Sequence, residues 1–515
     1  MSFPWLTVIA ALPLVGALAL LVLPRNGGVV KQAALAVSGA TLVLTAALAL
    51  RFEPGGGMQF EEDHTWIEAF GAHYALGVDG IGLTLLLMTA ILTPVVILAS
   101  WNDGDEGRWS TNAFFAWMLA LEGLAIGVFA ATDVFLFYVL FEATLIPVYF
   151  LIGGFGGVQR SYAAVKFLIF SLVGGLLMLA SVVGLYVVSA RAGEPSYLLN
   201  DLSQLNFSES TGRWLFLGFF VAFAVKAPMW PVHTWLPDAA ANSTPGTSVL
   251  LVSVLDKIGT FGMIRFCLGL FPEASQWASP VVVALAVFSI IYGALLAVGQ
   301  DDIRRLVAYT SVSHFGFIVL GIFAFTTQSA SGSTLYMFNH GLSTAALFLV
   351  TGFLISRRGS YRISDFGGAQ KVAPLLAGLF LIAGLSSLSL PGLAPFVSEF
   401  LVIAGTFSYS VPAAVIATVG IVLAALYILL MYQRTMTGPL RPDNAVITDL
   451  RAREVAALAP LVALIFALGF YPQVLLDVIN PAVETTLEEV GVSDPEPDSP
   501  VEAESQPTQE QETSK

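Results

Sequence analysis

Lys226 is the residue whose position says most about the chemistry of this chain. It ends the apolar run 214–225 and is followed by Ala-Pro-Met-Trp-Pro, with prolines at 228 and 231. A charged side chain at the bilayer centre costs about 2.5–3.5 kcal/mol, and such residues mark ion or proton paths. Proline removes a helix hydrogen bond, and inside a membrane the freed carbonyls must face protein or water. The segment therefore predicts a lysine on a broken membrane helix, as found in transport sites.

Four titratable residues inside apolar stretches form two pairs with nearly the same spacing. Glu142 and Lys226 are 84 positions apart, and His314 and Glu399 are 85 positions apart. Five apolar segments separate matching members of the two pairs, and because five is odd, the second unit must lie inverted in the membrane. Interrupted segments at matching places in two halves point to a transport site. The expected helix breaks are at Pro228 and Pro231 in the first unit and at Pro391 and Pro395 in the second.

Glu142 needs a partner from another helix, because its own apolar stretch contains no base. Lys226 is the candidate. Two such charges about 4 Å apart attract each other by about 4 kcal/mol at an effective dielectric constant near 20. A change in their separation would therefore change how firmly Lys226 holds a proton. The alternative is a static structural ion pair, although such pairs rarely repay their desolvation in stability alone.

A second group of buried titratable residues follows along the chain. Lys257 is the next buried base, and Asp256 beside it lies about 100° away around the same helix, where it either tunes Lys257 or belongs to another contact. His314 and His340 lie on consecutive predicted helices among serines and threonines. Histidine titrates near neutral pH, and hydroxyl groups and waters can bridge a proton wire. We expect Lys257, His314 and His340 to form a proton relay that ends at Glu399.

Two further residues, His233 and Glu122, each have two open interpretations, and a third, Cys267, limits the possible chemistry. His233, just after the first break, either serves an inner entrance or hydrogen-bonds loop backbone. Glu122 is an isolated membrane acid that either couples this site to a neighbouring subunit or pairs with an uncharged donor. The single cysteine, Cys267, excludes disulfides and cysteine metal sites. With no Walker loop and no dinucleotide fingerprint in the sequence either, we expect no cofactor, metal or redox centre in this chain.

The elements that must position these residues are membrane helices. The chain is 56% hydrophobic and 11% charged, whereas soluble proteins carry about 25% charged residues. About fourteen apolar runs approach the ~20 residues that cross a bilayer. The runs are 3–23, 29–50, 77–100, 112–131, 133–153, 163–190, 214–236, 245–271, 279–299, 303–326, 333–356, 375–402, 411–433 and 455–475. They predict an all-α polytopic membrane protein with two inverted five-helix repeats, each containing a broken helix.

This pattern divides the chain into five parts. They are three N-terminal transmembrane helices (1–111), the first repeat (112–271), the inverted repeat (279–433), a loop with the last helix (434–475) and an acidic tail (476–515). We expect the tail to be disordered, because it has too few large apolar residues to bury. Lys and Arg are concentrated in one set of alternate loops. By the positive-inside rule, both chain ends then lie outside.

Four sequence runs resemble the antiporter-like membrane subunits of respiratory complex I, the NADH–quinone oxidoreductase. They are AFAVKAPMWPVHTWLPDA (222–239), QDDIRRLVAYTSVSHFGF (300–317), NHGLSTAALF (339–348) and LPGLAPFVSEF (390–400), and the likeness covers about 20–475. The resemblance implies a proton-translocating subunit in the bacterial cytoplasmic membrane, with one half-channel from the inside and one to the outside. It implies that FMN, iron–sulfur clusters and quinone belong to partner subunits, and that neighbouring antiporter-like subunits are its closest partners. Glu142, Lys226, Lys257, His314, His340 and Glu399 match the family's positions.

A glutamate at position 399 is similar to the subunit M (chain 4) type within that family. The sister subunits usually carry lysine on the second broken helix. Two departures from the family pattern occur. Residues 241–245 replace a more polar loop, and Asp256 replaces a residue that is commonly apolar.

Other functions are consistent with parts of this pattern. The main alternative is a subunit of a multi-subunit Mrp-type cation/proton antiporter, which has no redox partner, and Glu399 in place of lysine argues against it. A membrane hydrogenase subunit is a third possibility. A passive assembly scaffold is a fourth, and the series of buried charges argues against that. Proteins that co-purify in mild detergent would separate these functions.

Overall fold

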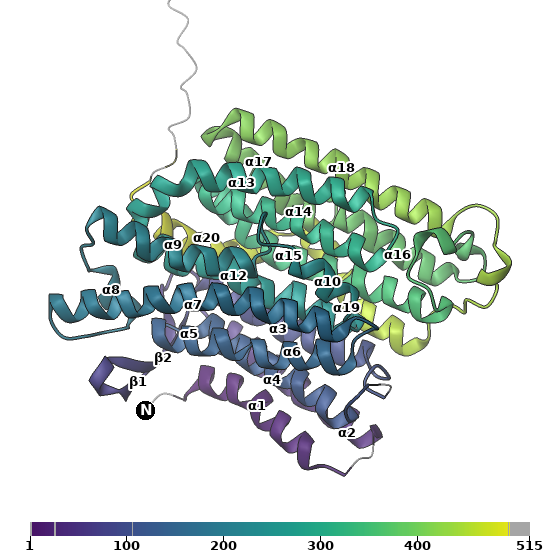
Figure 1. Cartoon of the computed structure of the whole chain (residues 1–515), viewed down its shortest axis with the longest axis horizontal. Coiled ribbons are helices and arrows are strands. Elements are labelled where there is room, and N and C mark those ends of the chain that lie inside the picture. Colours follow the sequence, from purple (N-terminus) through teal and green to yellow (C-terminus); the bar gives the residue numbers. More distant parts are fainter. Residues whose placement is uncertain (1–2, 25–26, 106, 493, 495–515) are drawn as a thin grey trace, which may run out of the picture.

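The chain is a bundle of helices packed side by side, with a small hairpin at one end (Figure 1). The computed structural model describes residues 3–24, 27–105, 107–492 and 494. The N-terminal helices α1 and α2 lie at one edge of the bundle in this view, and α17 and α18 lie at the opposite edge. After α18 the chain turns back, and α19 and α20 pack against α3 and α15.

The helices and strands have the following bounds. The first half contains α1 Trp5–Val22, α2 Gly27–Ala49, β1 Gln59–Ile67, β2 Ala72–Val78, α3 Gly80–Ala99, α4 Thr111–Ala130, α5 Val134–Ala143, α6 Leu145–Phe155, α7 Arg160–Ala192, α8 Leu199–Ser203, α9 Glu209–Lys226 and α10 Trp235–Ala241. The second half contains α11 Pro245–Val249, α12 Asp256–Gly262, α13 Pro272–Val298, α14 Ile303–Phe323, α15 Thr327–Arg358, α16 Pro374–Ser387, α17 Ala394–Tyr409, α18 Val411–Met436, α19 Ala452–Phe470 and α20 Gln473–Val490. Two π-helices, η2 Leu250–Leu255 and η3 Met263–Leu268, flank α12. The 3₁₀ turns are η1 Glu68–Phe70, η4 Ile363–Asp365, η5 Ala369–Lys371 and η6 Pro442–Asn444.

The helices account for all of the predicted membrane spans. Within the described ranges, 12 continuous helical segments are long and apolar enough to cross a membrane. The two predicted spans that remain are the broken ones. The span 214–236 consists of α9 and α10, and the span 375–402 consists of α16 and the start of α17. The all-α, polytopic fold with two broken helices is therefore confirmed.

The helix starts follow from the residues that precede them. Asp133 accepts a hydrogen bond from the backbone N–H of Leu136 at the start of α5 (2.8 Å), and Asp302 accepts one from Arg304 at the start of α14 (2.9 Å). These carboxylates satisfy backbone donors that have no partner within their helix. Caps of this kind fix where α5 and α14 begin along the chain.

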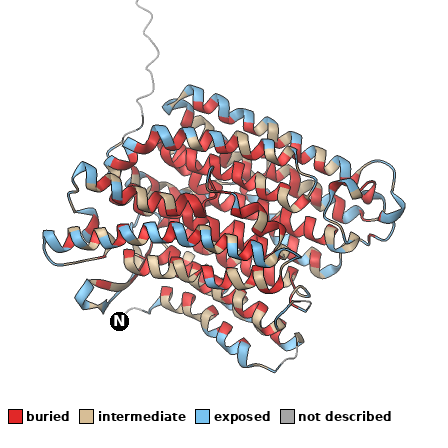
Figure 2. Cartoon of the chain, viewed as in Figure 1, coloured by how far each residue is buried: buried red, intermediate tan, exposed pale blue. Residues whose placement is uncertain are grey.

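The helices that carry Lys257, His314 and His340 form the centre of the bundle. The most apolar window of the segment from α11 to η3 is 100% buried, and those of α14 and α15 are each 94% buried, against 28% for α2. Figure 2 shows buried residues concentrated along the middle of the bundle and exposed residues on the outer helices. The outer helices therefore separate the central charges from the membrane.

The segment between the second and third predicted spans is more ordered than predicted. Residues 51–76 were expected as a loop, whereas β1 and β2 form an antiparallel hairpin in which Glu62 pairs with Leu76 and Thr65 with His73. A two-stranded hairpin is only marginally stable on its own, so its order depends on packing that the sequence pattern does not reveal.

The expectation of disorder from residue 476 onward is wrong for the first part of the tail. Residues up to Val490 form α20, whose apolar side chains recur every four residues and pack against α3 and α15. The residues of this stripe are Leu475, Ile479, Val483 and Leu487, and Val490 at the end of the helix is buried as well. This stripe buries one face of the helix while its acidic residues stay outside, so composition alone underestimated its order. Residues 495–515 lie outside the described part of the chain.

Candidate functional site

Lys226 is the last residue of α9, and it is only 1% exposed. The chain leaves the helix at Ala227 and resumes helical structure at Trp235. The indole N–H of Trp235 donates a hydrogen bond to the carbonyl of Val225 (2.9 Å). This bond satisfies a carbonyl near the break, as a buried helix end requires. The break predicted from Pro228 and Pro231 is therefore present, and it places Lys226 on irregular backbone.

The Lys226 ammonium group lies among aromatic rings. Its Nζ is 4.7 Å from the ring centroid of Phe141 and 5.8 Å from that of Phe167. It has no hydrogen-bond partner among the described residues. Ring faces attract cations, but they do not accept a proton. Lys226 is thus held in place without being neutralised.

Glu142 lies beside this site, at the end of α5. Glu142 and Lys226 are within electrostatic range of each other, but they do not form the direct ion pair that was predicted at about 4 Å. The physical reason is the ring of Phe141, which takes up the position next to the ammonium group. A Cβ on Gly175 of α7 would lie 1.9 Å from Glu142 Oε1. The carboxylate therefore occupies space that exists only because residue 175 is glycine.

Lys257 and His340 are in direct contact. Lys257 Nζ lies 2.6 Å from His340 Nδ1 and donates a second hydrogen bond to the carbonyl of Val252 (2.9 Å). Lys257 lies on α12 between two π-helical turns, and such turns are frequent at functional sites. Both side chains are buried. The sequence predicted these two residues in one relay, and the fold brings them together.

The contacts continue from His340 to Glu399. The rings of His314 and His340 lie 5.1 Å apart, nearly perpendicular, and His314 lies 5.9 Å from the ring of Tyr336. The Tyr336 hydroxyl donates to Glu399 Oε2 at 3.4 Å, a long hydrogen bond. Sequence reasoning missed Tyr336. The signal was its place four residues before His340, which puts both side chains on one face of α15.

The second break lies between α16 and α17, around Pro391 and Pro395. Asn339 of α15 donates hydrogen bonds to the carbonyl of Ala394 (2.8 Å) and to Ser398 Oγ (3.3 Å). This amide thereby ties the start of α17 to α15. Glu399, 3% exposed, is in turn held next to Tyr336.

Two predicted residues lie apart from this series. His233 is buried at the first break, with its ring 5.2 Å from Tyr292. Glu122 is buried on α4 beside Thr93 of α3. Neither has a hydrogen bond or ion pair to the residues from Lys226 to Glu399 in the described part of the chain. Their roles remain predictions.

The arrangement can hold and transfer protons. Its titratable groups are buried, except for the half-buried Glu142, and each can exist in a protonated and an unprotonated form at a cost that its neighbours set. Among the described residues, no group of three His, Cys, Asp or Glu side chains is placed to hold a metal ion. Amine, imidazole and carboxyl groups of this kind can take up and release protons, so the arrangement is chemically suited to proton transfer.

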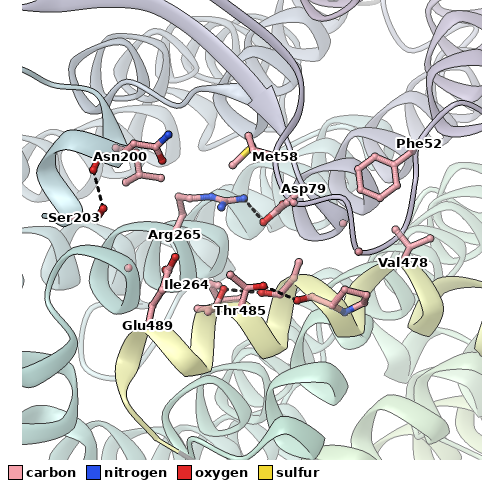
Figure 3. Close-up of a pocket in the computed structure, with 18 residues that line it drawn as sticks. Phe52, Met58, Asp79, Asn200, Ser203, Ile264, Arg265, Val478, Thr485 and Glu489 are labelled. Atoms are coloured by element: carbon pink, nitrogen blue, oxygen red, sulfur yellow. Dashed lines mark hydrogen bonds and ion pairs between the residues drawn. The ribbon is translucent and has the colours of Figure 1, made fainter.

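A polar pocket of about 270 Å³ lies at the far end of the helix that carries Lys257. Arg265 in this pocket forms an ion pair with Asp79 (2.7 Å), and Glu489 of α20 lies nearby (Figure 3). Asp79 also caps α3 by accepting a hydrogen bond from Gly82. The ion pair therefore joins the end of η3 to the start of α3.

Comparison with known proteins agrees with this fold and site. A family model described as NADH:quinone oxidoreductase/Mrp antiporter, transmembrane, matches residues 131–424. The chain belongs to this family of antiporter-like membrane subunits.

The most informative relatives identify the branch of the family. Subunit M of NADH-quinone oxidoreductase from Mycobacterium tuberculosis (strain H37Rv) is 50% identical over 96% of each chain. Subunit M from Rhodobacter capsulatus is 39% identical over 93% of this chain and 95% of the relative. The chain is thus of the subunit M type, a proton-translocating membrane subunit that works with the other subunits of complex I.

Solved structures support the same assignment. A chain of respiratory complex I from Thermus thermophilus with bound NADH matches with a TM-score of 0.86 and 32% identity, over 95% of this chain and 100% of that chain. A chain of the Mrp complex from Dietzia sp. DQ12-45-1b also matches with a TM-score of 0.86, but at 22% identity over 95% and 100%. The second match shows a shared fold alone. The complex I function is therefore better supported than the Mrp alternative.

Proposed function

We propose that protons cross this subunit through two half-channels joined by a central series of titratable side chains. The series contains Glu142, Lys226, Lys257, His340, His314, Tyr336 and Glu399. The observation that carries the proposal is the run of contacts from Lys257 through the two histidines to Tyr336 and Glu399. Such a run of titratable groups has no stabilising value that would repay its burial.

In this proposal, the distance between Glu142 and Lys226 at the first helix break changes during transport. Lys226 lies at a helix end, next to rings that hold its charge but accept no proton. A shift that moves Glu142 closer favours the charged lysine, and a shift that moves it away favours release of the proton. Lys226 therefore loads a proton when the carboxylate approaches and passes it on toward Lys257 when the carboxylate recedes.

The orientation and the repeat boundaries belong to the same proposal. Lys and Arg concentrate in one set of alternate loops, which supports a bacterial cytoplasmic membrane location with both chain ends outside. The first repeat (112–271) then receives protons from the inside, and the inverted repeat (279–433) releases them outside. FMN, iron–sulfur clusters and quinone are held by partner subunits.

Replacement of Glu142 tests the proposal. Glu142→Gln keeps nearly the same shape but removes the charge that acts on Lys226, so the complex should assemble and lose most of its proton pumping. Glu142→Asp retains a carboxylate and should be milder. The measurement is NADH-driven proton uptake in vesicles, with assembly checked on a native gel. Full pumping by an assembled Glu142→Gln complex would refute a functional pair.

A further inference from the structure

Between the first break and the contacts that run from Lys257 to Glu399, no direct contact joins Lys226 to Lys257. Lys226 Nζ has no hydrogen-bond partner in the described structure, whereas Lys257 uses its donors on Val252 and His340. The two lysines come from different helices, α9 and α12. A proton that leaves Lys226 therefore needs another group before it reaches Lys257.

One face of α12 packs directly against α9. A Cβ on Gly259 would lie 2.5 Å from the backbone nitrogen of Ala227 and 2.6 Å from the carbonyl oxygen of Phe223. Asp256 precedes Gly259 by three residues, so both lie on the same face of the helix. Lys257 is about 100° further round, where it meets His340 of α15. Asp256 thus faces the helix of Lys226 while its neighbour faces the histidines.

The Asp256 carboxylate is fully buried and unsatisfied. It is 0% exposed, and neither of its oxygens has a hydrogen-bond partner among the residues described. Lys226 and Lys257 are both within electrostatic range, but neither forms an ion pair with it. A buried acid without partners costs several kcal/mol, and inside a membrane such an acid points to a functional role.

We propose that Asp256 carries the proton between Lys226 and Lys257, a step that rests on the proton path proposed above. First, an N–H bond of the Lys226 ammonium breaks and an O–H bond forms on Asp256, which leaves a neutral amine and a neutral carboxyl group. Then that O–H bond breaks and an N–H bond forms on Lys257, which restores the carboxylate. The net result is one positive charge moved from the first lysine to the second.

The main alternative is that Asp256 remains ionised and acts only as a fixed negative charge. The two roles differ in one observable property. A carrier gains and loses a proton during turnover, whereas a fixed charge does not. An infrared difference spectrum detects this through the C=O stretch of a protonated carboxyl group.

The experiment uses the whole complex with Asp256→Asn, Asp256→Glu and, as a control, Ser253→Ala. Ser253 lies one turn earlier on η2, is equally buried and donates a hydrogen bond to the carbonyl of Gly341 (3.0 Å). Asp256→Asn should slow NADH-driven proton uptake about tenfold or more, as expected when a proton-transfer group is lost. Asp256→Glu and Ser253→Ala should retain most of the uptake.

The infrared readout separates the two roles. If Asp256 carries the proton, a carboxyl band should appear during turnover, be absent in Asp256→Asn and be displaced in Asp256→Glu. The displacement in Asp256→Glu decides between the two roles even where Asp256→Asn fails to assemble. Identical spectra in wild type and Asp256→Glu, or full uptake in Asp256→Asn, would overturn the inference.

Lys226→Gln is measured alongside. If Lys226→Gln is inactive while Asp256→Asn is fully active, only the role of Asp256 fails; if Lys226→Gln is fully active, the proposed path itself fails.

Discussion

At the scale of single residues, the site depends on what surrounds each charge. Lys226 lies over the ring of Phe141, and Glu142 lies against the backbone of α7 at Gly175. Neither neighbour was predicted, because an aromatic ring or a glycine in an apolar run gives no local sign of a distant charge. The titratable residues themselves were predictable, since a buried charge stands out in an apolar run. Their partners depend on how helices far apart in sequence pack together.

Gly175→Ala tests whether the position of Glu142 matters. The new Cβ would lie 1.9 Å from Glu142 Oε1, so the carboxylate must move and the interaction with Lys226 must change. We expect an assembled complex with clearly reduced proton uptake in vesicles. Gly39→Ala is the matched control, because a Cβ there meets nothing within 4 Å. Equal uptake by the two variants would show that the position of Glu142 is not critical.

At the scale of helices and strands, the two helix breaks were predicted from the sequence, but the hydrogen bonds that stabilise them were not. Prolines in apolar runs indicated both broken helices. The hydrogen bonds from Trp235 to Val225 and from Asn339 to Ala394 depend on tertiary packing, which spacing along the chain does not reveal. The hairpin β1–β2 and the helix α20 were missed for a related reason. Each gains its order from the helices on which it packs.

Trp235→Phe tests the support of the first break. The ring still packs near Phe167, but the hydrogen bond to the carbonyl of Val225 is lost. A buried carbonyl without its partner costs about 1–3 kcal/mol. We expect the complex to dissociate at a lower temperature and to pump less at the same level of assembly. Thermal dissociation followed on native gels measures the first effect, and an unchanged midpoint would argue against this role for Trp235.

At the scale of the whole molecule, apolar outer helices surround the central helices that carry the buried titratable residues. The helices that carry Lys257, His314 and His340 are almost entirely buried, and the outer helices face the membrane. Composition predicted the membrane location and the number of spans. Which spans lie at the centre was not predicted, because that depends on how helices far apart in sequence pack together.

The topology gives a prediction at this scale. With an even number of spans and most Lys and Arg in one set of loops, both chain ends should lie outside. A cysteine introduced in the last residues, with Cys267 replaced by serine, should react with an impermeant label from the outer side of intact cells. Labelling only in inverted vesicles, where the cytoplasmic side is exposed, would contradict this topology.

The central claim is that buried titratable groups carry protons through this subunit, and Glu399 at the end of the series tests it most directly. NADH-driven proton uptake in vesicles is measured for Glu399→Gln and Glu399→Lys. Glu399→Gln should assemble and pump far less, because an amide cannot take up and release a proton. Glu399→Lys should retain part of the uptake, because an amine can. A purely structural acid predicts the opposite order, so normal pumping in Glu399→Gln together with failed assembly in Glu399→Lys would contradict the account.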